Sequence, residues 1–189
     1  MMAPTTLPPV TSLQGADDND IKSVLDVLFE PSQDLHLIAI PAIRNSAPFS
    51  SYSSLIEYVG GLLFQLAENP STADSRAELH AILGSHPRLG EKKVDSAQSR
   101  AEQAHLNASG TSGDKEEEAA RLKALNEEYE ARFPGLRYVV FVNGRSRDVV
   151  MQNMRERIDR GDIFAEEREA IQAMIDIALD RAKKLQPAS

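Results

Sequence analysis

The chain has 189 residues, with 29 Asp and Glu against 21 Lys and Arg, which gives a formal net charge of −8. An acidic surface of this kind repels phosphate backbones, so we expect no nucleic-acid partner. The length suits one domain, the 41% apolar fraction excludes wholesale disorder, and the absence of Cys excludes disulfides, iron–sulfur clusters and a thiol nucleophile.

Residues 1–19 form a Pro-containing segment without Lys or Arg, which we interpret as a flexible N-terminal leader. A secretory signal would begin with positive charge, and this segment has none. No stretch approaches the ~20 consecutive apolar residues of a membrane helix, so we expect no membrane partner. The C-terminus is not a peroxisomal tripeptide. These features predict a cytoplasmic protein whose single domain covers residues 20–186.

Helical periodicity dominates the first half of the chain. Asp20 is a candidate N-cap for a helix that ends at Pro31. The apolar segment 35–43 is bracketed by prolines, and its periodicity leaves its structure open. A second helix is expected over 51–67.

Two details of this half bear on packing. The pair Gly60-Gly61 either weakens its helix or lets a neighbouring element approach closely. Ser75 and Glu78 have the spacing of a capping box, which predicts the start of a third helix. Gly84 then ends that helix.

Helices also dominate the second half. We expect them over 96–107, 116–133, from Ser146 or Asp148 to about residue 159, and over 165–185. Residues 138–142 are the one strongly β-like run. The sequence therefore predicts an all-α fold: a compact single-domain bundle of about seven to nine helices, with at most one short extended segment.

His86 is the first candidate for chemistry. It follows a helix stop and precedes Pro87, and a residue before proline favours extended backbone, so its imidazole is expected in a loop. The dipole of the preceding helix would favour the charged form. Loops carry function disproportionately, but most loop histidines have no such role, so both interpretations stay open.

Ser99, Glu102 and Gln103 form the second candidate cluster. If their helix begins at Asp95 or Ser96, the three side chains project from one face and can donate, accept and exchange a proton. Ser-x-x-Glu is also the capping-box pattern, so Ser99 and Glu102 could instead start the helix. The position of the helix start separates these alternatives.

Basic residues gather near both clusters despite the acidic total. Arg88, Lys92, Lys93 and Arg100 form either a solvated surface or a patch that attracts a carboxylate. Arg157 could grip a carboxylate with both guanidinium nitrogens, or form an ordinary ion pair.

A metal site is a further alternative. Glu102 and His105 form one Glu-x-x-His motif, which His86 could complete. Carboxylate-bridged metal sites in bundles use two such motifs, and only one is found here. We therefore expect no metal.

Several segments together resemble one enzyme family. Residues 86–92 (HPRLGEK) resemble the His-Pro-Asp-Leu-Ala-Gly-Lys signature of 2-oxo-4-hydroxy-4-carboxy-5-ureidoimidazoline (OHCU) decarboxylases. Residues 99–103 (SRAEQ) resemble that family's Ser-x-x-Glu-Gln element, and residues 125–133 (LNEEYEARF) its Leu-Asn-x-x-Tyr-x-x-Arg-Phe helix. Three more segments resemble its early Glu-containing segment, its aromatic–apolar stretch and its Arg-x-Arg-Leu motif: residues 28–32 (LFEPS), 138–146 (YVVFVNGRS) and 155–158 (RERI).

The resemblance implies a helical, commonly homodimeric decarboxylase that forms (S)-allantoin in urate degradation without a cofactor. By motif position, it implies His86 as the central acid and base, with Glu102 as its acidic partner. It implies that the anionic ureide substrate is bound by Pro87, Ser99, Gln103, Val139, Val140 and Arg157.

The sequence departs from the family pattern at Arg88, Gly90, Glu91 and His105. These positions bear on which ureide is the substrate. The alternative function is therefore that of a divergent or inactive homologue, acting as a ureide-binding or helical interaction protein.

Overall fold

The computed structural model describes residues 6–68, 73–91, 94–108 and 112–186. These residues contain nine helices and no strand, so the prediction of an all-α fold is confirmed. In chain order the elements are the 3-10 helix η1 (Val10–Gly15) and the α-helices α1 (Asp18–Phe29), α2 (Gln33–Asn45), α3 (Tyr52–Glu68), α4 (Ala73–Leu83), α5 (Ala97–Ala108), α6 (Ser112–Arg132), α7 (Arg147–Arg160) and α8 (Ile163–Leu185).

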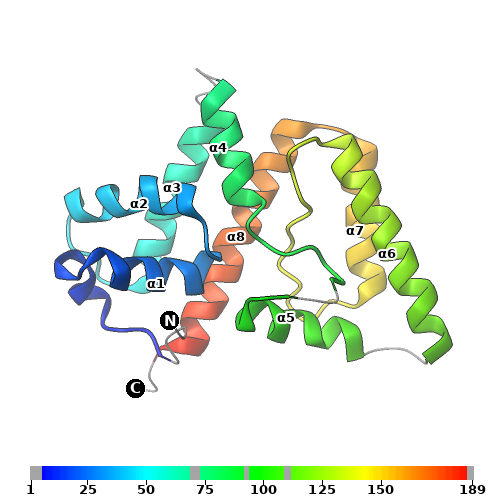
Figure 1. The fold of residues 1–189 in the computed structure, drawn as a ribbon, viewed down its shortest axis with the longest axis horizontal. Helices are drawn as coiled ribbons and strands as arrows, with labels where there is room; N and C mark the ends of the chain where they lie inside the picture. Colours follow the sequence, from blue (N-terminus) through cyan, green and yellow to red (C-terminus); the bar gives the residue numbers. More distant parts are fainter. Residues whose placement is uncertain (1–5, 69–72, 92–93, 109–111, 187–189) are drawn as a thin grey trace.

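Helix α8 runs through the middle of the molecule, with α1 to α4 on one side and α5 to α7 on the other (Figure 1). The Asp162 carboxylate caps its start by accepting hydrogen bonds from the main-chain N–H groups of Phe164 and Ala165. Ile171, Met174 and Ala178 are fully buried along its length. The last turns of α8 therefore lie between the two groups of helices.

A glycine allows α3 and α8 to approach closely. A Cβ atom added at Gly60 would lie 2.4 Å from Cδ1 of Ile175 in α8, whereas nothing lies within 4 Å of the same atom at Gly61. Of the two alternatives for this pair, close approach therefore applies to Gly60.

The proline-bracketed segment 35–43 is helical and belongs to α2. The Ser32 side chain caps this helix by accepting a hydrogen bond from the N–H of Leu35 (3.2 Å). Pro41 lies inside the helix and supplies no N–H to the carbonyl of Leu37. Leu37 is 64% exposed, so water can reach this turn of the helix.

Helix starts differ from the predictions at two places. Asp17, not Asp20, caps α1, and its carboxylate accepts a hydrogen bond from the main-chain N–H of Asp20 (2.9 Å). Helix α4 begins at Ala73, so Ser75 lies within the helix and the capping-box prediction is wrong. Ser146 caps α7, as one of the two predictions stated.

Part of the expected leader packs on the helical domain. Leu7 and Leu13 are buried, and the N–H of Leu7 donates a hydrogen bond to the carbonyl of Leu185 (2.9 Å). The Tyr52 hydroxyl donates to the carbonyl of Pro8 (2.8 Å). Apolar side chains in this segment explain the difference, because they enter the core beside α3 and α8. Residues 1–5 lie outside the described part of the chain.

Residues 137–142 run as an irregular segment between α6 and α7. The β-like run 138–142 lies in this irregular segment and forms no strand in the described residues. No helix of the described chain is long and apolar enough to span a membrane.

Candidate functional site

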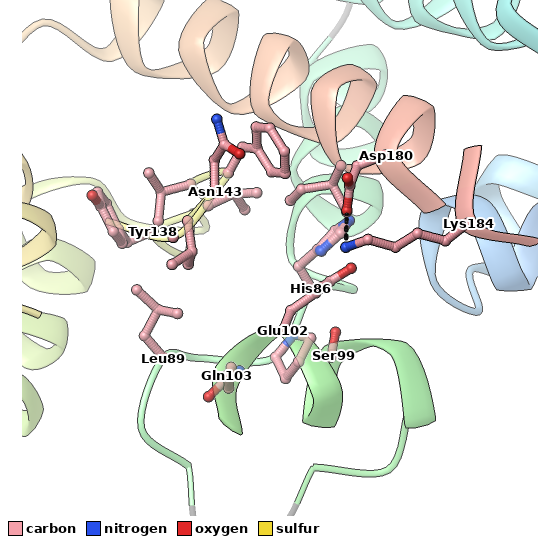
Figure 2. A pocket seen from close by; sticks show the side chains of 16 residues that line it. His86, Leu89, Ser99, Glu102, Gln103, Tyr138, Asn143, Asp180 and Lys184 are labelled. Atoms are coloured by element: carbon pink, nitrogen blue, oxygen red, sulfur yellow. Dashed lines mark hydrogen bonds and ion pairs between the residues drawn. The ribbon is translucent and has the colours of Figure 1, made fainter. Parts of the chain in front are cut away.

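A cavity of about 210 Å³ opens between α5, the end of α8, the loop after α4 and the segment 138–144 (Figure 2). Seven of the sequence-predicted residues line it: His86, Pro87, Ser99, Glu102, Gln103, Val139 and Val140. The remaining lining residues are Leu89, Tyr138, Phe141, Val142, Asn143, Gly144, Ile177, Asp180 and Lys184. The cavity thus combines apolar walls with a few polar groups, as is typical of small-molecule sites.

His86 is buried against this cavity. Its side chain is 5% exposed, and its Nε2 atom has no hydrogen-bond partner among the described residues. Burial and the Arg181 guanidinium together lower the pKa of His86 to about 4, although Glu30 acts in the opposite direction. The imidazole is therefore neutral at pH 7, and the expectation of a charged form favoured by the helix dipole is wrong.

The start of α5 separates the two alternatives for Ser99 and Glu102. Ser96 caps this helix, because its hydroxyl accepts a hydrogen bond from the N–H of Ser99 (3.2 Å). Helix α5 begins at Ala97, which places Ser99, Glu102 and Gln103 within the helix. The three side chains form one polar face toward the cavity.

Glu102 pairs with Arg181 of α8. The Arg181 Nε lies 2.7 Å from one carboxylate oxygen of Glu102, and Nη2 lies 2.9 Å from the other. Such a bidentate pair holds the carboxylate plane in one orientation. Glu102 and His86 line the same cavity, but the hydrogen-bond partner that the structure gives to Glu102 is Arg181.

Arg181 also binds a second buried carboxylate, that of Glu30. Its Nη2 lies 2.8 Å from Glu30 Oε1, and the Ser99 hydroxyl donates a hydrogen bond to the same oxygen (2.6 Å). Burial would raise the pKa of Glu30, but Arg181, Ser99 and His86 together hold it below its ordinary value. The proton of Ser99 is therefore directed at an ionised carboxylate.

The backbone at Glu30 is unusual for a residue with a side chain. Its φ angle is 70°, in the region that favours glycine. Positions of this kind cost about 1–3 kcal/mol and cluster at functional sites. Here the conformation lets α1 end while the carboxylate turns inward to Arg181.

Gln103 fastens the loop that carries His86. Its side-chain oxygen accepts a hydrogen bond from the N–H of Gly90 (3.0 Å), and its nitrogen donates to the carbonyl of Arg88 (3.2 Å). Asn126 of α6 donates to the carbonyl of Leu89 (3.1 Å). Two helices thus fix the course of this loop beside the cavity.

Arg157 is the predicted site residue that does not line the cavity. It is 4% exposed, its Nε lies 2.9 Å from Glu166 Oε2, and its Nη1 donates a hydrogen bond to the carbonyl of Val139 (3.0 Å). Tyr129 donates to the same Glu166 oxygen (2.6 Å). Arg157 therefore supports the segment 138–142 from the side away from the cavity.

Two of the basic residues, for which a solvated surface and a carboxylate-attracting patch were the alternatives, are engaged away from the cavity. Both oxygens of the Glu130 carboxylate accept hydrogen bonds from Arg88. Arg100 donates to the carbonyls of Val94 and Asp95. Lys92 and Lys93 lie outside the described residues.

The alternative metal set loses one of its ligands to an ion pair. The Glu102 carboxylate is bound by Arg181 through both oxygens. The side chain of His105 lies outside the described part of the chain. No group of three or more His, Cys, Asp or Glu in the described residues is arranged to hold a metal ion.

Sequence reasoning missed Arg181, Asp180 and Lys184, which all lie on the last turns of α8. One signal was present for Arg181: it follows Met174 and Ala178 at helical spacing on a stripe that is otherwise apolar. A charged residue at a core position is rarely buried without a partner. Nothing in the spacing marked Asp180 and Lys184.

A helical domain that encloses a cavity with an unpartnered neutral histidine and an anchored carboxylate fits a small-molecule enzyme that moves protons. The model of the OHCU decarboxylase family matches residues 14–183. The chain therefore belongs to the OHCU decarboxylase family, and the resemblance found in the sequence is confirmed. This membership supports a decarboxylase of urate degradation. A search of the curated proteins finds no match to the chain.

Proposed function

We propose that the chain converts 2-oxo-4-hydroxy-4-carboxy-5-ureidoimidazoline to (S)-allantoin and CO₂ without a cofactor. The observation that carries this proposal is the buried, unpartnered Nε2 of neutral His86 on the wall of the cavity. A buried polar atom without a partner is unfavourable by about 1–3 kcal/mol, so a ligand group that binds it gains affinity. The family membership supports the same reaction class.

The chemistry suits a site whose residues only move protons. When CO₂ leaves, the electrons of the broken carbon–carbon bond move toward the adjacent C=N group, whose nitrogen takes up a proton from solvent. Neutral His86 then accepts the proton of the ring hydroxyl, which becomes the carbonyl. The resulting imidazolium returns this proton to the neighbouring ring carbon. Delivery from one side of the ring defines the S configuration.

Glu102 and Ser99 would orient the ring. Arg181 fixes the Glu102 carboxylate, which can accept hydrogen bonds from ureido N–H groups. Ser99 donates its proton to Glu30 and accepts a hydrogen bond from Arg181, which leaves one lone pair to accept from the ligand. Pro87, Val139 and Val140 would shape the walls. Gln103 and Arg157 act indirectly in this proposal, by holding the loop and the segment that form the site.

The test is to generate the substrate from urate with urate oxidase and its hydrolase, and to follow its loss by absorbance. The protein should accelerate this loss, and His86→Ala should reduce kcat by about 10²–10⁴-fold. His36→Gln is the matched control, because His36 pairs with Asp26 on α1 and does not line the cavity. The same decay with and without protein would overturn the proposal and leave a ureide-binding protein as the alternative.

Two further parts of the proposal concern the setting of the enzyme. Assembly as a homodimer is an expectation from the family resemblance, which sedimentation of the purified chain would test. A cytoplasmic location likewise stays a prediction, which imaging of a tagged chain would test.

A further inference from the structure

The described part of the cavity wall carries more negative than positive side chains, although the proposed ligand is an anion. Among the described lining residues, Glu102 and Asp180 are acidic, and Lys184 is the one Lys or Arg. His86 is neutral at pH 7, because burial lowers its pKa to about 4. A substrate carboxylate that enters this space therefore meets a single positive side chain.

Arg181 lies close by but has its donors occupied. Its N–H groups are directed at Glu102, Glu30, Ser99 and the carbonyl of Val27. It is 2% exposed and does not line the cavity. The Arg181 guanidinium therefore organises the protein's own carboxylates.

Lys184, unlike Arg181, lines the cavity, is exposed, and has one ion-pair partner among the described residues. Its Nζ lies 2.5 Å from Asp180 Oδ2, and its side chain is 66% exposed. Figure 2 shows the Lys184 side chain reaching from α8 toward His86, with Asp180 beside its end. An exposed pair of this kind contributes about 0–1 kcal/mol, so a ligand can displace it.

We propose that Lys184 is a substrate-binding residue that recognises the carboxylate of the anionic ureide, and that Asp180 is the counter-ion displaced on binding. This inference rests on the proposed function and names which side chain selects an acid over its neutral counterpart. An ammonium with three donors on a flexible stem can leave Asp180 and follow the incoming carboxylate.

The position of Lys184 also predicts which kinetic constant depends on it. The ammonium holds the carboxylate of the bound substrate and stays in contact with it in the transition state, before CO₂ departs. An interaction that stabilises the ground state and the transition state equally lowers KM and leaves kcat unchanged. Lys184→Met should therefore raise KM about tenfold and leave kcat within about twofold, a loss of about 1.4 kcal/mol in binding.

Asp180 and Lys183 supply the discriminating variants. Asp180→Asn removes the competing anion, so KM should fall about threefold. Lys183→Met is the matched control, because Lys183 is exposed on the same turn of α8 but does not line the cavity. Added salt should raise the KM of the unmodified chain more than that of Lys184→Met.

An unchanged KM in Lys184→Met, or an equal change in Lys183→Met, overturns the role of Lys184. A higher KM in Asp180→Asn overturns the displacement, because Asp180 would then hold Lys184 in its binding position.

Calorimetry with hydantoin-5-acetate and hydantoin-5-acetamide separates this inference from the proposed function. The acid and the amide share a cyclic ureide and differ in charge. We expect the unmodified chain to bind the acid about tenfold more tightly than the amide, and Lys184→Met to lose the difference. If the chain shows this binding preference but no turnover, the role of Lys184 in carboxylate binding is supported and the proposed decarboxylase activity is contradicted. Normal turnover with no effect of Lys184→Met supports the decarboxylase and contradicts the role of Lys184. The absence of both turnover and binding contradicts both proposals.

Discussion

The imidazole of His86 is neutral in the folded chain because burial and the Arg181 guanidinium oppose its protonation. In an unfolded chain the same side chain titrates near its ordinary pKa of 6.5. Between about pH 4 and 6.5 the unfolded state therefore binds a proton that the folded state does not. The stability that His86 contributes is complete above this window and is lost as the pH falls through it.

His86→Gln should remove this part of the pH dependence. Between pH 7 and the lower end of the window, we expect the unmodified chain to lose about 3 kcal/mol more unfolding free energy than the variant loses. Urea unfolding at both pH values measures the difference. The pH dependence that comes from the carboxylates cancels, because both proteins share them. Equal losses in the two proteins would contradict a neutral His86.

Arg157 offers a second test at this scale, since its assignment changes from substrate contact to support. Removal of the Arg157 guanidinium leaves the negative charge of the fully buried Glu166 with fewer positive partners. Arg157→Met should therefore lower the unfolding free energy by about 3 kcal/mol. Arg155→Met is the matched control on the same helix: its pair with Glu128 is exposed, so its loss should cost less than about 1 kcal/mol.

Kinetics distinguish the two roles of Arg157. Support of the segment 138–142 predicts that a more conservative Arg157→Lys variant alters kcat and KM together, in step with its loss of stability. A raised KM with unchanged stability would instead place Arg157 in contact with the substrate.

At the scale of elements, the contact between α3 and α8 depends on the absence of a side chain at Gly60. Gly60→Ala adds a Cβ atom 2.4 Å from Cδ1 of Ile175, whereas Gly61→Ala adds one in open space. Because Ala favours helices over Gly, Gly61→Ala should be neutral or stabilising by up to about 1 kcal/mol. Gly60→Ala should be about 1–3 kcal/mol less stable than Gly61→Ala, because of overpacking.

A double-mutant cycle measured by thermal unfolding assigns this difference to the contact. Ile175→Val removes Cδ1, so the unfavourable effect of Gly60→Ala should shrink in that background. An unchanged effect would show that the side chain of Ile175 does not limit the approach of α3.

Sequence patterns predicted most of these elements because apolar residues at helical spacing mark the faces that the helices bury. They failed where local signals compete. Ser75 and Glu78 have capping-box spacing within a helix that begins at Ala73. The segment 35–43 carries Pro41, and only packing of Leu35, Ala39 and Ile43 against the core shows that the helix continues through it.

At the scale of the whole molecule, the site is assembled from distant parts of the chain around the end of α8. The contact between Arg181 and Glu102 joins residues 79 positions apart, and that between Arg181 and Glu30 joins residues 151 apart. Local spacing located His86 and the face of α5, but it carries no information on such partners. Family motifs pointed to Arg157, which the fold places behind the segment that lines the cavity.

We infer that the His86 cavity delivers a proton to one face of the decarboxylated ring. Circular dichroism of allantoin formed from freshly generated substrate tests it most directly. We expect strong enrichment of (S)-allantoin with the unmodified chain, and largely racemic product with His86→Gln, whose turnover is reduced by about 10²–10⁴-fold. Racemic product from the unmodified chain, or equal enrichment with His86→Gln, would contradict it.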